Sequence, residues 1–203
     1  MPTNTVIRLA LETDAERMLA IYTPIIRETA ISFELEPPTV AEFQLRVSNT
    51  LRQTPWLVCE EDGKILGYAY AGSYRARAAY QWSVEVTVYV GPASRGRGVG
   101  RALYTALCRC LRVQGYHNAF AAIALPNDAS VKLHEKLGFK PIGVYRSVGH
   151  KLGRWHDVGW WQLALRESGS SPSPPLPVRD VSDTPSWQRS LESGTGLLRL
   201  QPR

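Results

Sequence analysis

A glycine-rich stretch in the middle of the chain combines residue types that suit the binding of a phosphate. It reads Ser94-Arg-Gly-Arg-Gly-Val-Gly-Arg101 and follows the β-branched segment 83–90. Glycines let a backbone approach a ligand closely with positive φ angles, and the unpaired N–H groups that open a helix attract anions. Arg95, Arg97 and Arg101 add fixed positive charge. The stretch therefore predicts a phosphate-binding turn between a strand and a helix.

Two familiar nucleotide-binding loops do not match this stretch. A Walker loop requires a Gly-Lys-Ser/Thr sequence, and none follows here. A dinucleotide-binding loop requires an acidic residue at the end of a strand about 20 residues later, and that position is not acidic either. The turn is therefore expected to bind a phosphate-bearing ligand of another class.

Two side chains outside the turn could move protons. Glu85 lies in an expected strand between Val84 and Val86, where a carboxylate is costly to bury without a purpose. His134 lies in an expected short helix over residues 130–137, and an imidazole can give or take a proton near neutral pH. Each has an ordinary alternative, because Glu85 could face solvent from its strand and His134 could lie on the surface of its helix.

A third group could bind a carboxylate. Arg75 and Arg77 lie between two expected strands, and Tyr80 follows them. Arginine binds carboxylates through two parallel hydrogen bonds, and a free amino acid offers a carboxylate beside its amine. Two solvated loop arginines are the alternative interpretation.

The elements that must position these residues alternate along the chain. Thr13 with Glu16, and Thr39 with Glu42, have the spacing of capping boxes that open two helices. Further helices are expected over residues 98–114 and 130–137. Strands are expected over residues 6–10, 56–60, 65–74, 83–90, 119–124, 140–148 and 155–165. This order predicts an α/β fold, with helices on the faces of a mixed sheet.

The composition changes near Glu167. A chain of 203 residues suffices for one domain, which we expect over residues 1–166. From Ser168 the sequence is rich in Ser, Pro and Gly and offers little apolar surface to offset the entropy of ordering. Residues 167–203 are therefore expected to form a mostly disordered tail, which could dock locally through Trp187 or Leu197-Leu198.

Composition also argues against several classes of protein. The net charge of +6 belongs to the first 166 residues, because the last 37 hold four basic and four acidic residues. This moderate charge suits a phosphate-bearing ligand better than nucleic acid, since the chain lacks a Lys/Arg block. Three cysteines without CxxC spacing predict free thiols and no metal site. With no apolar run of roughly 20 residues and no signal segment, we expect a cytoplasmic protein without membrane contact.

Two segments together resemble the GNAT superfamily of acetyltransferases. Arg95-x-x-Gly98-x-Gly100 resembles its pyrophosphate-binding signature, and Asn127–Phe139 resembles its second signature, in which Asn holds the pantetheine arm. The resemblance implies a GNAT fold and acetyl-CoA as co-substrate. It places the acetyl-CoA contacts at Val88, Tyr89, Val90, Gly96, Arg97, Gly98, Val99, Gly100, Arg101, Asn127 and Lys136.

Further stretches resemble the phosphinothricin and methionine sulfoximine (sulfone) acetyltransferases of that superfamily, over about residues 7–165. They are Phe33, Trp56-Leu-Val, Tyr70-Ala-Gly72, Arg75-x-Arg77-x-x-Tyr80-x-Trp82, Glu85-x-Thr87-Val-Tyr-Val90, Leu125-Pro-Asn-Asp128 and Trp155-His-Asp-Val-Gly159. The resemblance implies acetylation of the α-amine of a small amino acid. It places the acceptor contacts at Phe33, Arg75, Ala76, Arg77, Tyr80, Glu85, Val86 and Thr87.

The resemblance also implies roles. Glu85 would be the general base, and His134, where most of the superfamily has Tyr, would act as acid or base, with Tyr104 as a further contributor. A backbone N–H near Val88 would bind the developing oxyanion in a ternary complex, by direct transfer. The family analogy adds a homodimer with contacts near Trp160.

Two other functions stay open on the sequence alone. The acceptor could be another amine, such as a polyamine, an antibiotic or a protein N-terminus, although Arg75 and Arg77 would repel a polyamine. The chain could instead be a CoA-binding sensor without catalysis. The presence of both Glu85 and His134 favours an enzyme over the sensor.

Overall fold

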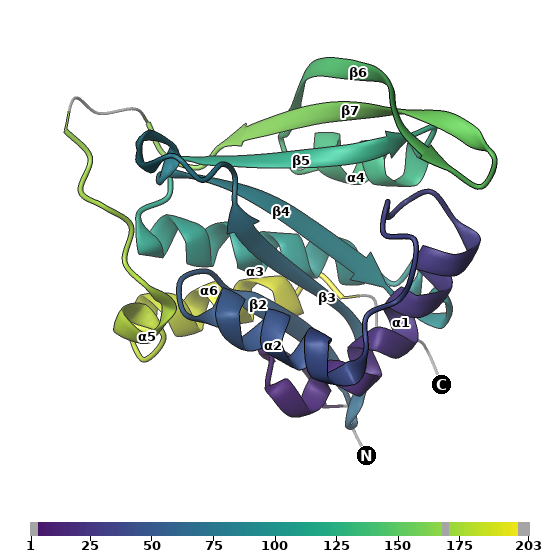
Figure 1. Cartoon of the computed structure of the whole chain (residues 1–203). Coiled ribbons are helices and arrows are strands. Elements are labelled where there is room, and N and C mark those ends of the chain that lie inside the picture. The colour runs from purple at the N-terminus through teal and green to yellow at the C-terminus, as the bar shows by residue number, and fades with distance from the viewer. Residues whose placement is uncertain (1–3, 168–170, 199–203) are drawn as a thin grey trace.

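The computed structural model describes residues 4–167 and 171–198, and its strands form a mixed seven-stranded sheet (Figure 1). Across the sheet the strands run β1 (Thr5–Leu9), β2 (Trp56–Glu61), β3 (Lys64–Ser73), β4 (Ser83–Val90), β5 (Asn118–Leu125), β7 (Arg154–Ala164) and β6 (Lys140–Lys151). Neighbouring strands are antiparallel except β4 and β5, which are parallel. The α/β fold with a mixed sheet that the sequence predicts is confirmed.

Helices cover both faces of this sheet (Figure 1). They are α1 (Ala15–Glu28), α2 (Val40–Leu51), α3 (Val99–Gln114), α4 (Asp128–Lys136), α5 (Val178–Val181) and α6 (Pro185–Thr195). One apolar layer joins the sheet to α1 and α2, and the other joins it to α3, α4 and α6. None of the helices in the described ranges is long and apolar enough to cross a membrane.

One of the two predicted capping boxes forms. Thr39 Oγ1 accepts a hydrogen bond from the N–H of Glu42 at 3.2 Å, and the Glu42 carboxylate accepts from the N–H of Thr39 at 2.7 Å. The box at Thr13 is wrong, because α1 begins at Ala15 without a side-chain cap. The fully buried Asp14 instead accepts from the N–H of Leu11 and from Arg8 on β1, six residues earlier.

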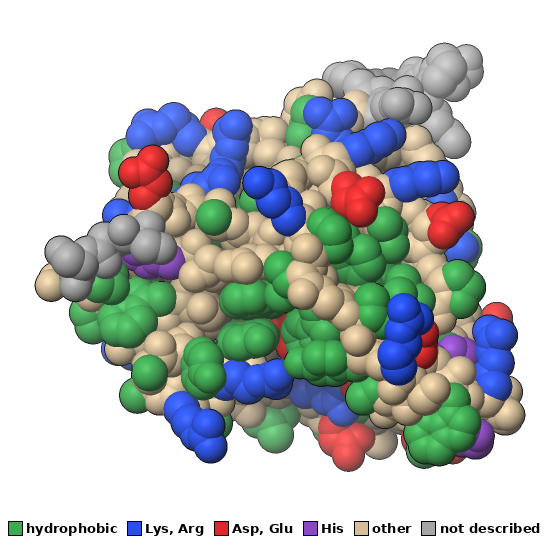
Figure 2. Space-filling view, turned by 90° about the horizontal axis from the view of Figure 1, so that it is seen from above, with side chains coloured by type: hydrophobic (Ala, Val, Ile, Leu, Met, Phe, Trp, Pro, Cys, Tyr) green, Lys and Arg blue, Asp and Glu red, His purple; other side chains and the backbone are tan. Residues whose placement is uncertain are grey.

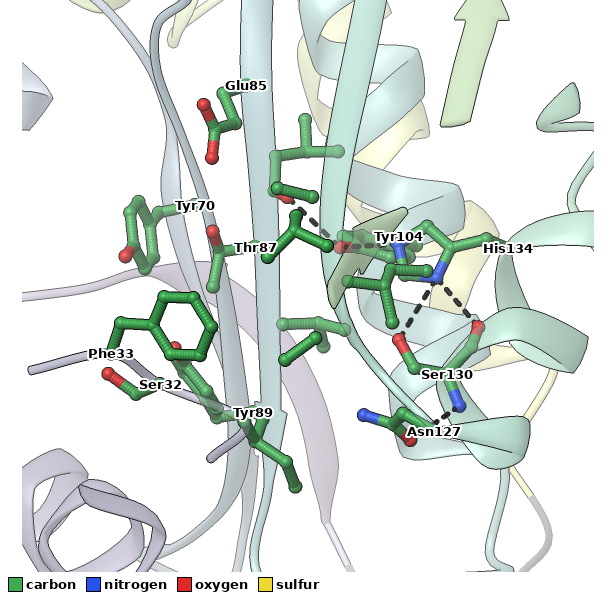
Figure 3. Close-up of a pocket in the computed structure, with 17 residues that line it drawn as sticks. Ser32, Phe33, Tyr70, Glu85, Thr87, Tyr89, Tyr104, Asn127, Ser130 and His134 are labelled. Carbon is green, nitrogen blue, oxygen red and sulfur yellow. Dashed lines mark hydrogen bonds between the residues drawn. The ribbon is translucent and has the colours of Figure 1, made fainter. Parts of the chain in front are cut away.

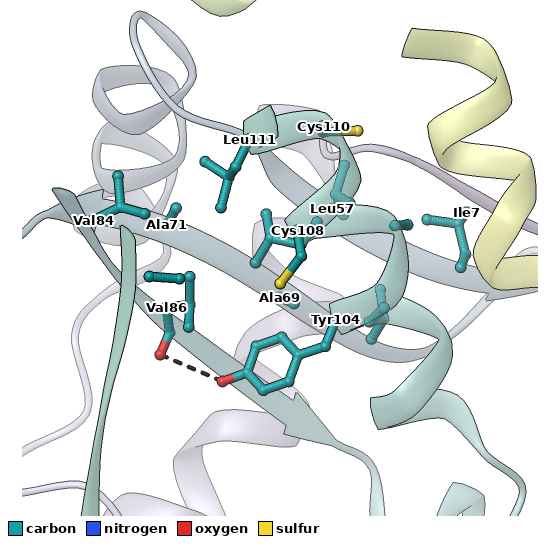
Figure 4. Packing of buried hydrophobic residues seen from close by; sticks show 14 of the residues in the cluster. Ile7, Leu57, Ala69, Ala71, Val84, Val86, Tyr104, Cys108, Cys110 and Leu111 are labelled. Carbon is teal, nitrogen blue, oxygen red and sulfur yellow. Dashed lines mark hydrogen bonds between the residues drawn. The ribbon is translucent and has the colours of Figure 1, made fainter. Parts of the chain in front are cut away.

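The layer between α3 and the sheet is densely apolar (Figure 4). Tyr104, Cys108 and Leu111 on α3 pack over Val84 and Val86 of β4. The three cysteines are free and buried, and burial raises the pKa of the Cys59 and Cys108 thiols to about 12. The described residues contain no cluster of three or more His, Cys, Asp or Glu side chains that could hold a metal ion.

The segment after β7 differs from the predicted disordered tail. Residues 171–198 include α5 and α6, and Trp187 is fully buried in the layer shared with α3. Leu191, one helical turn after Trp187, lies in the same apolar cluster. Although the segment is rich in Ser and Pro, the amphipathic helix α6 supplies enough apolar surface to pack against α3. The average composition of the segment does not show this periodic pattern.

The functional geometry of the sheet comes from the incomplete pairing of its two parallel strands. β4 and β5 pair only over Ser83–Glu85 and Asn118–Phe120, although each strand continues for five residues beyond that point. From Val86 onward, one edge of β4 therefore lacks a β5 partner, and a gap opens in the middle of the sheet.

Candidate active site

The unpaired edge of β4 presents backbone groups to the gap between β4 and β5. The Tyr104 hydroxyl, from α3, lies 3.3 Å from the carbonyl oxygen of Val86 and reaches it on this edge. In a strand the N–H and C=O of one residue point to the same edge, and the pattern repeats every second residue. The N–H of Val88 therefore also points toward the gap, where it can bind an oxyanion.

A cavity of about 310 Å³ surrounds this edge and extends to both faces of the sheet (Figure 3). Its walls include Glu85, Thr87, Tyr70 and Phe33 on one side of β4, and Tyr104, His134, Ser130 and Asn127 on the other. Alternation along β4 produces this division, because Val84 and Val86 face α3 while Glu85 and Thr87 face the opposite layer.

Glu85 meets an environment that favours its neutral form. Its cross-strand partner on β3 is Gly72, which has no side chain and therefore leaves space beside the carboxylate. Burial raises the pKa of Glu85, and the positive charge of Arg75 opposes that rise. A carboxylate whose pKa is shifted toward neutrality is better matched to general base catalysis than a fully solvated one.

His134 is buried and hydrogen-bonded on both ring nitrogens. Nδ1 donates to the backbone oxygen of Ser130 at 2.8 Å, and Nε2 lies 3.1 Å from the Tyr104 hydroxyl. Burial lowers the pKa of His134, and the Ser130 carbonyl opposes this. Burial also raises the pKa of Tyr104 well above its ordinary value. The favoured state is a neutral imidazole whose Nε2 accepts a hydrogen bond from the Tyr104 hydroxyl, whose single proton then points to His134 and away from the Val86 carbonyl.

The predicted phosphate-binding turn forms at the start of α3. Gly96 and Gly98 have φ angles of +78° and +85°, which side-chain-bearing residues rarely adopt, and Gly98 precedes the first residue of the helix. The turn borders a second cavity, of about 530 Å³, which we call the phosphate cavity after the turn in its wall. The same cavity is lined by the predicted residues Val88, Tyr89, Val90, Gly96, Gly98, Val99, Gly100, Arg101 and Asn127.

The two cavities adjoin along β4. They share Ile31, Val88, Tyr89, Asn127 and Ser130. Asn127 caps α4 by accepting from the N–H of Ser130 at 3.2 Å, and this bond leaves its amide NH2 free for a ligand. The joined cavities have a helix start that attracts anions at one end and a partly apolar passage to Glu85 at the other. This shape and charge fit an elongated thioester that carries phosphates, as acetyl-CoA does.

Two residues predicted to contact acetyl-CoA lie elsewhere. The Arg97 guanidinium forms two hydrogen bonds with the Glu61 carboxylate, at 3.1 and 2.5 Å, and does not line the phosphate cavity. Lys136 is exposed on α4 and lines neither cavity. Arg95 and Arg101 do line the phosphate cavity. The sequence spacing predicts that Arg97 lies near the glycine turn, but it does not reveal that the Glu61 carboxylate pairs with this guanidinium.

The predicted acceptor residues divide between two places. Phe33, Glu85, Val86 and Thr87 line the cavity with His134. A second set lines a separate cavity of about 320 Å³: Arg75, Ala76, Arg77 and Tyr80. The Arg75 guanidinium lies 4.8 Å from the ring centre of Tyr74 and 6.0 Å from that of Trp160. Within one chain the structure therefore does not bring the arginine pair into the Glu85 cavity.

Sequence reasoning also missed wall residues. Tyr70 lies beside Glu85 because it pairs with Thr87 across β3 and β4, and alternation within the hairpin was the signal for it. Ser32 enters from the loop between α1 and α2, and no local pattern indicates this. Phe33 of the same loop packs on Gly149, where an added Cβ would lie 2.2 Å from the ring.

Comparisons with known proteins agree with this geometry. Residues 7–160 match the acetyltransferase (GNAT) domain. Phosphinothricin N-acetyltransferase of Streptomyces viridochromogenes is 42% identical over 176 residues, which cover 87% of this chain and 94% of the relative. The L-methionine sulfoximine/L-methionine sulfone acetyltransferase of Pseudomonas aeruginosa is 38% identical over 168 residues, covering 82% and 98%.

Solved structures agree as well. A phosphinothricin acetyltransferase from Sinorhizobium meliloti in complex with acetyl-CoA superposes with a TM-score of 0.79 at 33% identity, covering 84% of this chain and 92% of that one. A putative acetyltransferase from Salmonella typhimurium with its cofactor acetyl-CoA gives 0.80 at 34% identity, covering 84% and 99%. This chain, with its divided sheet and glycine-rich turn, belongs to the GNAT acetyltransferase family.

Proposed function

We propose that the protein transfers the acetyl group of acetyl-CoA to the α-amine of a small amino acid. The preferred acceptors carry a tetrahedral oxygenated centre at the side-chain end, as methionine sulfone, methionine sulfoximine and phosphinothricin do. The observation that carries the proposal is the placement of Glu85 and His134 on opposite sides of one cavity, which Val88 of β4 also lines. The names of the two relatives support this class of acceptor.

Glu85 prepares the nucleophile. Free amines are largely protonated at pH 7 and cannot attack a carbonyl in that form. Glu85 takes this proton directly or through one water, and its raised pKa brings it closer to the pH at which it works. The neutral amine then lies on the Glu85 side of the gap.

The groups across the gap stabilise the transfer. Acetyl-CoA supplies a thioester carbon that a neutral amine attacks directly. The amine nitrogen bonds to that carbon, and the carbonyl oxygen gains negative charge beside the N–H of Val88. When the carbonyl re-forms, the carbon–sulfur bond breaks and the nitrogen loses its second proton to solvent, which leaves a neutral amide. The Tyr104 hydroxyl, held against His134, gives the departing thiolate its proton, and Tyr104 is reprotonated from solvent when the products leave. Proximity within the ternary complex provides much of the acceleration.

One observation favours a second class of acceptor. The arginine pair at positions 75 and 77 lies outside the Glu85 cavity of the single chain, so a carboxylate clamp is not part of that cavity. An amine without a carboxylate is therefore the second candidate. Kinetics with methionine sulfone and with the corresponding amine that lacks the carboxylate distinguish the two, because the amino-acid proposal requires a higher kcat/KM for methionine sulfone and the second candidate requires the reverse.

We further propose a cytoplasmic homodimer. β6 is an edge of the sheet, and its exposed apolar side chains include Ile142, Val144, Tyr145 and Val148. Figure 2 looks onto the β6 and β7 side of the molecule, where apolar side chains lie among Lys and Arg. An edge strand of this kind is a template for pairing. A monomeric mass at micromolar concentration by light scattering would contradict the dimer.

Thiol release tests the proposed function. The protein is incubated with acetyl-CoA and, in turn, L-amino acids, methionine sulfone, methionine sulfoximine, phosphinothricin and polyamines. The proposal requires saturable turnover on the sulfone-like acceptors. Turnover on polyamines alone favours the second candidate, and acetyl-CoA binding without turnover on any acceptor favours a sensor or a protein substrate.

A further inference from the structure

The segment after β7 runs back along α3 toward the phosphate-binding turn. It begins at the far end of α3, where Gln114 exchanges hydrogen bonds with Leu176: Nε2 donates to the Leu176 carbonyl at 2.7 Å, and the Leu176 N–H donates to the Gln114 carbonyl at 2.8 Å. It ends beside the first turn of α3, where Gly194 of α6 contacts Ala102. The segment is therefore antiparallel to α3 and returns to the end that binds anions.

Two features hold α6 close against α3. Trp187 is fully buried in the apolar layer that Leu103 and Leu107 of α3 also form. At Gly194 an added Cβ would lie 2.3 Å from the carbonyl oxygen of Ala102, so only glycine permits this approach of the two backbones. The chain that follows α6 is consequently delivered to the phosphate-binding turn.

Leu197 is the residue delivered there. Its side chain lines the same cavity as Gly98, Gly100 and Arg101, and it is half-buried. Its neighbour Leu198 also packs on the apolar layer but does not line that cavity. The match to the acetyltransferase domain ends at residue 160, so this segment lies outside the residues that define the family match.

We propose that the C-terminal segment is part of the acetyl-CoA site, and that Leu197 forms an apolar wall for the nucleotide half of acetyl-CoA. The inference rests on the proposed function, because it takes the phosphate cavity as the acetyl-CoA site. The turn beside Leu197 receives the phosphates, whereas the pantetheine arm runs past Asn127 toward Glu85 at the other end of the channel. Leu197 therefore contacts the nucleotide half and not the pantetheine arm.

Substitution of single residues tests the proposal better than deletion, because deletion would uncover the site of the buried Trp187. Isothermal titration calorimetry measures the affinity of coenzyme A and of 4′-phosphopantetheine for the full chain, Leu197→Ala and Leu198→Ala. Loss of the apolar contact at Leu197 is expected to weaken coenzyme A binding about 5- to 20-fold. Leu198→Ala is the matched control and should bind coenzyme A with the affinity of the unaltered protein. Both variants should bind 4′-phosphopantetheine with the affinity of the unaltered protein.

Several outcomes would overturn the proposal. Equal affinities of Leu197→Ala and the full chain for coenzyme A exclude Leu197 from the site. An equal loss in Leu198→Ala, or an equal loss for phosphopantetheine, assigns the effect to packing of the segment. If the unaltered chain binds no coenzyme A, the proposed function fails with the inference, and this result is distinct from the others.

Discussion

Substitution of the buried Lys151 tests how the wall of the acceptor cavity is held in place. The Lys151 ammonium donates to the backbone oxygens of Ser32 and Glu34, at 2.6 and 2.7 Å, and only 5% of the residue is exposed. Ser32 and the adjacent Phe33 line the cavity that contains Glu85. One lysine at the end of β6 therefore fixes the loop between α1 and α2 over the cavity that contains Glu85.

The geometry sets the size of the effect of Lys151→Met. Each buried carbonyl that loses its donor costs about 1–3 kcal/mol. Methionine needs no desolvation of a charge, which offsets part of this cost and leaves a net loss of about 2 kcal/mol. That loss shifts the equilibrium between the closed and open loop by a factor of about 30, so the acceptor KM is expected to rise by up to about 30-fold.

Steady-state kinetics with methionine sulfone measure this effect. The acetyl-CoA KM should change less, because Ile31 is the residue of loop 29–39 that lines the phosphate cavity. Lys140→Met, an exposed position on the same strand, is the control. If the acceptor KM of Lys151→Met equals that of Lys140→Met, the lysine does not hold the loop, and the reasoning is refuted.

Three further predictions concern the site itself. Tyr104→Phe removes the hydroxyl that faces His134, so kcat should fall about 10²-fold with unchanged coenzyme A affinity in calorimetry, and an unchanged kcat would exclude the hydroxyl. Arg95→Ala should weaken coenzyme A binding most at low salt, whereas Arg97→Ala, whose guanidinium is engaged by Glu61, should bind almost normally; the reverse order contradicts the assignment. Burial raises the pKa of Glu85, so kcat/KM should increase with pH as the carboxylate ionises, with an apparent pKa above 4.5. A pH–rate profile whose apparent pKa is 4.5 or lower would contradict this assignment.

Local patterns predicted the elements whose signals are short in range. The capping box of Thr39 and Glu42 and the glycine turn before α3 each depend on a few adjacent residues, and both form. The order of elements along the chain and the mixed sheet followed from the alternation of strand and helix patterns. These features are determined within one helix or one turn, where steric and hydrogen-bonding rules act directly.

Long-range partners decided the features that the sequence did not predict. Arg97 leaves the phosphate cavity because Glu61 on β2, 36 positions earlier, accepts its guanidinium. The position of Arg75 likewise follows from stacking on an aromatic ring of another strand. Such pairings depend on the register of strands far apart in the chain, which periodicity does not specify.

The central claim is that Glu85 is the base of an acetyl transfer, and Glu85→Gln tests it most directly. The measurement is kcat for methionine sulfone at saturating acetyl-CoA, together with coenzyme A affinity and the unfolding temperature. Because burial raises the Glu85 pKa, folding disfavours the ionised side chain, and neutral Gln should leave stability at pH 7 equal or higher. We predict a loss of kcat of about 10²- to 10⁴-fold with normal coenzyme A binding. A folded variant that binds coenzyme A and retains its kcat would contradict the account.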